Sequence, residues 1–280
     1  MKKNVIQWAT LSAIMLMALW MSACQNGGKS TENEVNEEDS VEVKEKAANI
    51  VFKTFESHVS DEKCSVDYVV SYPVGGADSA LVACVRTWIN KALGDTYTGD
   101  LANAQELVDH YVAVNREEFD YEDFFPEENE PLSFSIDSIY VMYECNDYVT
   151  IVSSGYYYPS GAAHGMPHYF GATIKSNGTI EWDMFKDSKS DTFQSIIKDG
   201  LREHFELGKN ENLSEYLFPD LGKKIPLPTC PPLLTDKGVM FIYGAYEIVP
   251  YSYGMPQFTV PYDRMKEVMG QGLISLLGLE

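Results

Sequence analysis

The chain has 280 residues, of which 45% are hydrophobic, 42 are acidic and 21 are basic, so its formal net charge at pH 7 is −21. This acidic balance argues against binding to nucleic acid or docking on anionic lipid, and it would speed the encounter with a basic protein partner. The length and the hydrophobic fraction allow one large or two small globular domains with a sizeable core.

Residues 1–23 have the pattern of a bacterial lipoprotein signal peptide. Lys2 and Lys3 supply positive charge, and the uncharged, mostly apolar run after them is shorter than the roughly 20 apolar residues of a membrane-spanning helix. Small residues precede Cys24, which predicts its lipidation and a stable attachment to the bilayer through several acyl chains. Because Gln25 follows the cysteine, similarity to known sorting signals implies the outer membrane of a cell envelope.

Residues 24–48 contain no aromatic side chain and many charges. Such a segment cannot bury enough apolar surface to offset its ordering entropy, so it is expected to be a disordered acidic tether. The remainder is expected to form two sub-domains, residues 49–128 and residues 129–280.

The first sub-domain is expected to combine two strands with two helices. Alternating apolar residues indicate strands over residues 50–59 and 64–74. After a Gly-Gly break, Asp78 can cap the next helix, and an apolar stripe predicts a second helix over residues 103–118. The acidic, proline-containing segment 120–131 is expected to be a loop or a boundary.

The second sub-domain is expected to be a sheet with separate helices. Residues 132–137 alternate between apolar and polar side chains, and the apolar run 139–143 is expected to continue as a buried strand. Asn177-Gly178 predicts a hairpin turn because both residues tolerate positive φ. Asp191 and Gln194 resemble a capping box before an amphipathic helix. These patterns together predict an α+β fold with packed helices and a mostly antiparallel sheet.

The most informative stretch is residues 239–264, which read VMFIYGAYEIVPYSYGMPQFTVPYDR. An apolar strand leads into a proline-stiffened crossing with Tyr246, Tyr251 and Tyr253, and a second short strand then precedes a helix that starts at Pro261. The crossing either packs as a rigid plug of the core or presents some of its tyrosines to a ligand. Tyrosine suits recognition because it offers a large amphipathic contact area at low entropic cost.

The run F-x-Y-x-x-Y-E-I-x-P-Y-x-x-G-x-x-x-F-T-V-P-Y in this stretch resembles the C-terminal signature of the RsiV-like domain of unknown function. Upstream, Ser160-Gly-Ala-Ala-His-Gly165 and Trp182-Asp-Met-Phe185 are similar to a second block of that family. The family supplies the extracytoplasmic part of a lysozyme-sensing anti-sigma factor, is appended to some peptidoglycan deacetylases and occurs in many lipoproteins. The resemblance covers roughly residues 130–270 and implies a binding module for a lysozyme-type basic protein or a cell-wall glycan.

The residue pattern favours binding over catalysis. His164 and His168 lie four residues apart, but a glycine and a proline between them prevent a helix, and no glutamate intervenes, so a zinc-protease site is not expected. No other nucleophile, phosphate or dinucleotide motif is present, and no metal, cofactor or catalytic residue is predicted. The candidate ligand-binding residues are Tyr157, Tyr158, His164, His168, Tyr246, Tyr251 and Tyr253. An envelope hydrolase or deacetylase acting on peptidoglycan and a structural or assembly lipoprotein are the alternatives.

Four cysteines remain besides Cys24, namely Cys64, Cys84, Cys145 and Cys230. An even number in an oxidising compartment allows two disulfides in any of three pairings. Cys84 lies on the apolar stripe of its helix, where a buried thiol is an equal expectation.

Overall fold

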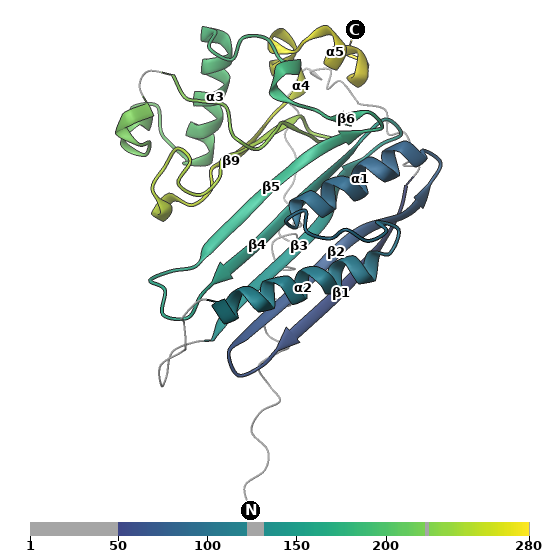
Figure 1. Cartoon of the computed structure of the whole chain (residues 1–280). Coiled ribbons are helices and arrows are strands. Elements are labelled where there is room, and N and C mark those ends of the chain that lie inside the picture. Colours follow the sequence, from purple (N-terminus) through teal and green to yellow (C-terminus); the bar gives the residue numbers. More distant parts are fainter. Residues whose placement is uncertain (1–49, 122–131, 222–223, 280) are drawn as a thin grey trace, which may run out of the picture. The chain divides into compact units, whose positions relative to one another are not determined.

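The computed structural model describes residues 50–121, 132–221 and 224–279, which all belong to one compact unit (Figure 1). The predicted signal peptide, Cys24 and the acidic tether lie outside these residues. Within them, each helix is too short or too polar to span a bilayer.

A six-stranded sheet forms the centre of the unit, with its strands in chain order from β1 to β6. β2 and β3 run parallel, whereas the other neighbours in this sheet run antiparallel. A parallel pair needs a long crossover connection, and the two helices between β2 and β3 provide it. The strands are β1 (Ile50–Ser60), β2 (Cys64–Gly76), β3 (Ser133–Glu144), β4 (Val149–Tyr158), β5 (Met166–Lys175) and β6 (Gly178–Thr179).

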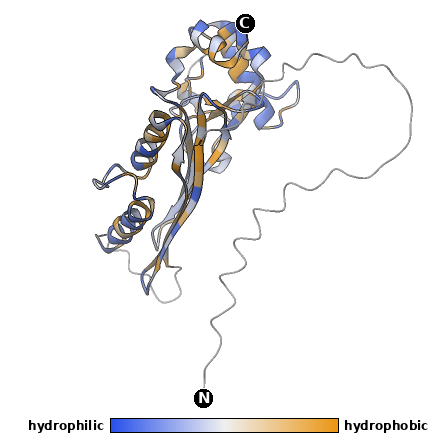
Figure 2. Cartoon of the chain, turned by 90° about the vertical axis from the view of Figure 1, so that its right-hand side faces the viewer, coloured by the Kyte–Doolittle hydropathy of each residue, from blue (hydrophilic) through white to orange (hydrophobic). Residues whose placement is uncertain are grey.

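Helices α1 (Ser79–Ala92) and α2 (Ala104–Tyr121) cover one face of this sheet (Figures 1 and 2). Asp78 caps α1 as predicted, because its carboxylate accepts hydrogen bonds from the backbone N–H groups of Ala80 and Leu81. The apolar stripes of both helices turn toward the strands and form one core with them, and each large side chain buried there contributes roughly 1.5–3 kcal/mol. Fully buried members of this core include Val66, Val70, Tyr72, Val85, Ile89, Leu107 and Ile151.

The C-terminal part builds a second core around a three-stranded antiparallel sheet in the order β7, β8, β9. Helix α3 packs against β9, and Gly200 of α3 leaves room for the ring of Phe258. The elements are α3 (Asp191–His204), β7 (Leu233–Leu234), β8 (Val239–Ile242), β9 (Gln257–Val260), α4 (Tyr262–Met265) and α5 (Gln271–Leu277). The two sheets and five helices of the described residues confirm the predicted α+β class.

The predicted capping box of α3 is wrong. Ser190 is the N-cap, and its hydroxyl accepts a hydrogen bond from the backbone N–H of Phe193. Asp191 is the first helical residue, where a negative charge complements the helix dipole. Gln194 instead exchanges hydrogen bonds with the backbone of Ile225, which ties α3 to the long connection before β7.

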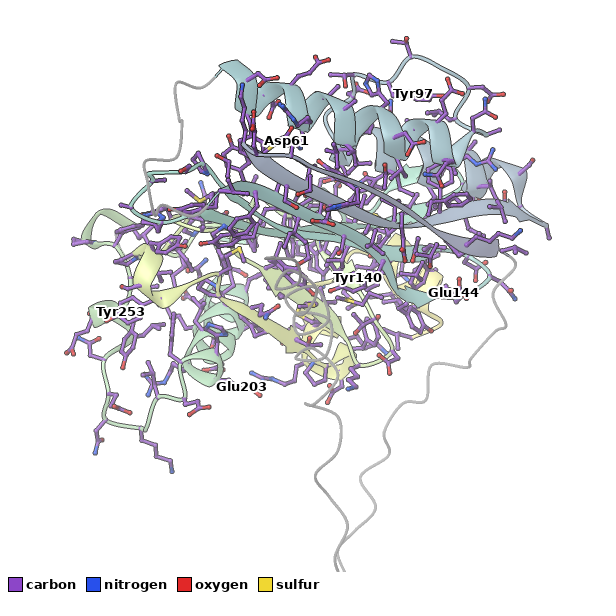
Figure 3. The ribbon with its side chains drawn as sticks, turned by 90° about the horizontal axis from the view of Figure 1, so that it is seen from below. Asp61, Tyr97, Tyr140, Glu144, Glu203 and Tyr253 are labelled. Carbon is purple, nitrogen blue, oxygen red and sulfur yellow. The ribbon has the colours of Figure 1, made fainter. Side chains whose placement is uncertain are left out.

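The C-terminal part covers only some of the second face of the large sheet. Val152 of β4 packs there against Leu233 and Ile242. The prediction that residues 139–143 form a buried run is therefore wrong, since Ile139 alone is buried and Tyr140 is 36% exposed. Figure 3 shows Tyr140 on the side of the sheet away from α1 and α2.

Strands from both predicted sub-domains share one sheet, since β2 pairs with β3 across the predicted boundary at residues 128 and 129. That boundary stays a prediction. The four cysteines of the described residues are free thiols, with Cys64 and Cys230 buried and Cys84 and Cys145 half-buried. Burial raises the pKa of the Cys230 thiol to about 11.

Candidate ligand-binding site

Two loops that are far apart in the sequence meet at one end of the large sheet. The turn at residues 159–165 joins β4 to β5, and the tyrosine-rich crossing at residues 243–256 joins β8 to β9. The hydroxyl of Tyr251 donates a hydrogen bond to the carbonyl oxygen of Gly165 at 2.8 Å, and the N–H of Gly165 donates to the hydroxyl of Tyr156 at 3.1 Å. A side chain at position 165 would overlap the ring of Tyr156, so only glycine allows this contact.

Three rings from the two loops form a ring platform, which consists of His164, Tyr246 and Tyr251. The rings of His164 and Tyr251 are stacked, with centroids 4.0 Å apart and planes 20° from parallel. The ring centroid of Tyr246 lies 5.6 Å from that of Tyr251, and its hydroxyl lies 3.3 Å from Nε2 of His164. Tyr246 is 46% exposed, and His164 is exposed as well.

Tyr246 has a left-handed backbone, with a φ of 62°. This conformation costs a residue with a Cβ roughly 1–2 kcal/mol and persists only where the surroundings fix it. Glu247 fixes the crossing here, because its carboxylate accepts hydrogen bonds from the backbone N–H groups of Gly244 and Thr229, each at 2.6 Å. The platform is thus held by a rigid loop.

A ladder of rings on the neighbouring strands extends the platform. Phe134 of β3 stacks on Tyr156 and on Tyr158 of β4, with centroid distances of 5.8 and 5.5 Å. Tyr156 joins the ladder to the platform through Gly165, whose N–H donates to the Tyr156 hydroxyl and whose carbonyl oxygen accepts from the Tyr251 hydroxyl. Burial raises the pKa of Tyr251, and the neighbouring Tyr156 and Tyr246 add to this rise. We name the whole array the aromatic stripe, and its members are Tyr158, Phe134, Tyr156, Tyr251, His164 and Tyr246.

The structure places four of the seven predicted ligand-binding residues in this stripe, namely Tyr158, His164, Tyr246 and Tyr251. Tyr157 points to the opposite face of the sheet, where its ring stacks on Phe119 of α2 at 5.1 Å. Tyr253 packs against Phe205 and Tyr216 at the edge of the C-terminal part (Figure 3). Phe134 and Tyr156 were not among the predicted residues, although their alternate positions on adjacent strands are the kind of pattern that places rings on one face.

His168 lies in a separate polar cluster beneath the helices. Its Nε2 is 3.2 Å from Oδ1 of Asp137, whose other oxygen accepts a hydrogen bond from Ser135 at 2.9 Å. Burial raises the pKa of Asp137, and the neighbouring His168, Ser135 and Tyr68 act against this rise. Burial lowers the pKa of His168, and the charge of Asp137 opposes that shift.

Ser153 completes a serine, histidine and aspartate set, but the geometry does not match a catalytic triad. A triad needs the aspartate on one ring nitrogen and the serine on the other, so that the imidazole can pass a proton between them. Here Ser153 Oγ and Asp137 Oδ1 both lie 3.2 Å from the same atom, Nε2 of His168. Within the described ranges, no three histidine, cysteine or acidic residues are grouped so that they could hold a metal ion.

Asp137 was missed because an alternating strand does not tell which of its faces is inside. Ser133, Ser135 and Asp137 turn toward the helices and are buried, while Ile136 is 46% exposed. The alternating polar residues Ser133, Ser135 and Asp137 were the signal in the sequence for this cluster, because they form the face of β3 that the helices cover.

Residues 182–263 match the family model described as protein of unknown function (DUF3298). This DUF3298 segment is under a third of the chain and contains α3, β8, the tyrosine-rich crossing and β9. It supplies Tyr246 and Tyr251 to the stripe, whereas His164, Phe134, Tyr156 and Tyr158 come from outside it. None of the curated proteins matches the chain.

Two crystal structures of DUF3298 proteins share the fold beyond this segment. The protein from Bacteroides fragilis NCTC 9343 superimposes with a TM-score of 0.65 at 16% identity, over 84% of this chain and 100% of that chain. The protein from Pseudomonas aeruginosa PAO1 gives a TM-score of 0.55 at 19% identity, over 80% of this chain and 96% of that one. The DUF3298 architecture therefore includes the large sheet and its helices, which the segment itself does not cover.

Proposed function

We propose that the chain is a cell-envelope binding module and that the aromatic stripe binds a cell-wall glycan. The observation that carries the proposal is Tyr246, an exposed side chain on a left-handed backbone. An exposed ring gains little from the core to offset such strain. Strained residues cluster at ligand-binding sites, where the surrounding structure holds them in position.

The chemistry of the stripe suits a sugar chain. A pyranose ring presents an apolar C–H face, which lies flat on an aromatic ring, and hydroxyl groups at its edge. Tyrosine offers both a ring face and a hydroxyl that donates and accepts. The six rings follow one another from β4 to the crossing, so an extended glycan could contact several of them at once.

The envelope location rests on the sequence. A signal pattern ending at Cys24 and an acidic tether would hold the module outside the inner membrane, where peptidoglycan is the abundant glycan. The resemblance to the RsiV-like domain, whose relatives include peptidoglycan deacetylases, points to the same class of ligand.

The test is calorimetric titration of the full chain with a soluble N-acetylglucosamine tetramer. We expect Tyr246→Ala to weaken binding about tenfold, since loss of one stacked ring removes roughly 1–1.5 kcal/mol. Tyr253→Ala is the matched control, because this ring is equally exposed and lies in the same crossing but packs on Phe205. Equal losses in both variants, or no binding of the tetramer to the unaltered chain, would contradict the proposal.

A basic protein of the lysozyme type is the second candidate ligand. The observation that favours it is the net charge of −21, which attracts cationic partners over distances of about a Debye length. The two candidate ligands differ in how their affinity depends on salt. Attraction of a basic protein weakens as the ionic strength rises, whereas stacking on a neutral sugar is nearly independent of it.

A further inference from the structure

A cavity of about 530 Å³ lies between α1 and β5, on the face of the large sheet that the aromatic stripe does not use. Helical spacing brings Cys84, Trp88 and Lys91 of α1 to one wall. Alternate residues of β5 form the opposite wall, where the small Ala172 lies between Phe170 and Ile174. The volume falls within the range of roughly 300–1,000 Å³ that small-molecule sites occupy.

The lining is mostly apolar, and only some of its polar groups have hydrogen-bond partners within the protein. The thiol of Cys84 donates to the carbonyl of Ser176 at 3.4 Å, and the hydroxyl of Thr87 donates to the carbonyl of Ala83 at 2.9 Å. The carboxylate of Glu181 accepts a hydrogen bond from the hydroxyl of Thr179. These groups thus have partners inside the protein.

Lys91 and Trp88 differ from them. In the part of the chain that the structure describes, the ammonium of Lys91 forms no ion pair or hydrogen bond, and the indole N–H of Trp88 has no acceptor. The ring of Trp88 packs at a tilt against Phe170, with centroids 6.2 Å apart. The cavity therefore offers the exposed ammonium of Lys91 and the indole N–H of Trp88, both without a partner among the described residues, beside an apolar interior.

We propose that this cavity binds a small amphiphile with an apolar body and one carboxylate head. The body would fill the space over Ala172 beside the packed rings of Trp88 and Phe170, and the head would accept hydrogen bonds from Lys91 and the indole N–H. An ammonium head is disfavoured because it would meet the like charge of Lys91. Such a site is independent of glycan binding at the stripe.

The probe is decanoate, titrated calorimetrically into the full chain below its micelle concentration and compared with decylammonium. Ala83 is exposed and lines the cavity, so Ala83→Trp is expected to fill part of the cavity without changing the core. Ala113→Trp places the same ring at an exposed position of α2 as the control. We expect decanoate to bind and Ala83→Trp to reduce its affinity at least tenfold, while Ala113→Trp leaves it unchanged.

A second pair of variants tests the head group. We expect Lys91→Met to weaken decanoate about tenfold and Lys198→Met, at an exposed position of α3, to have no effect. The proposal is overturned if decanoate does not bind, if decylammonium binds as tightly, or if neither Ala83→Trp nor Lys91→Met differs from its control.

Discussion

At the scale of single residues, Gly155 decides whether the polar cluster beneath the helices can form. It lies on β4 directly opposite His168 of β5. A Cβ at this position would collide with the imidazole, with the carbonyl oxygen of Ile136 at 2.5 Å and with Oδ1 of Asp137 at 2.7 Å. The absent side chain is therefore what lets the imidazole lie across the strand and reach the carboxylate.

Gly155→Ala is expected to lower the free energy of unfolding by roughly 1–3 kcal/mol, because the backbone of β3 and the buried carboxylate cannot both move aside. Gly75→Ala is the control, since a Cβ there meets nothing within 4 Å and Gly75 does not have positive φ. Urea denaturation followed by circular dichroism measures both. A Gly155→Ala variant as stable as Gly75→Ala would show that the imidazole of His168 does not lie across β4 at this position.

At the scale of elements, the sequence predicted most strands and helices correctly because hydrophobic period and caps are local properties. Asp78 caps its helix as its side chain chemistry requires. The predicted hairpin between β5 and β6 forms as well, but its turn lies one residue earlier than predicted, since Lys175 pairs with Gly178 across Ser176 and Asn177 and only Gly178 has a positive φ. Which face of a strand is buried was harder to predict, since the two-residue alternation of β3 is the same whichever face the helices cover. The site was harder still, because the contact between Gly165 and Tyr251 joins loops 86 residues apart.

Substitution of two isoleucines of β3, one on each face, tests how differently the two faces are covered. Ile139→Ala is expected to cost roughly 2–5 kcal/mol of unfolding free energy, because Ile139 is 1% exposed in the core under the helices. Ile136→Ala, three residues earlier on the other face, is expected to cost less than about 1 kcal/mol, since Ile136 is 46% exposed. Equal costs in chemical denaturation would mean that another part of the chain covers the second face.

At the scale of the whole molecule, charge and shape act on a ligand in different ways. The excess of 42 acidic over 21 basic residues sets a long-range field, which raises the rate of encounter with a cation but carries little detail of shape. In the proposed function, stacking on the aromatic stripe would act only at contact and would depend little on salt. A partner that uses both would bind quickly through charge and selectively through rings.

This difference gives the test for a basic protein partner. If a basic lysozyme binds, its affinity for the full chain is expected to fall at least tenfold between about 0.05 and 0.5 M salt, because the added ions shorten the Debye length from about 14 to about 4 Å. Acetylated lysozyme, which keeps its fold but loses the charge of its lysines, is expected to bind weakly at both concentrations. Absence of heat with the basic protein at either salt concentration excludes this ligand, and equal affinities at both would assign the interaction to the rings rather than to the acidic surface.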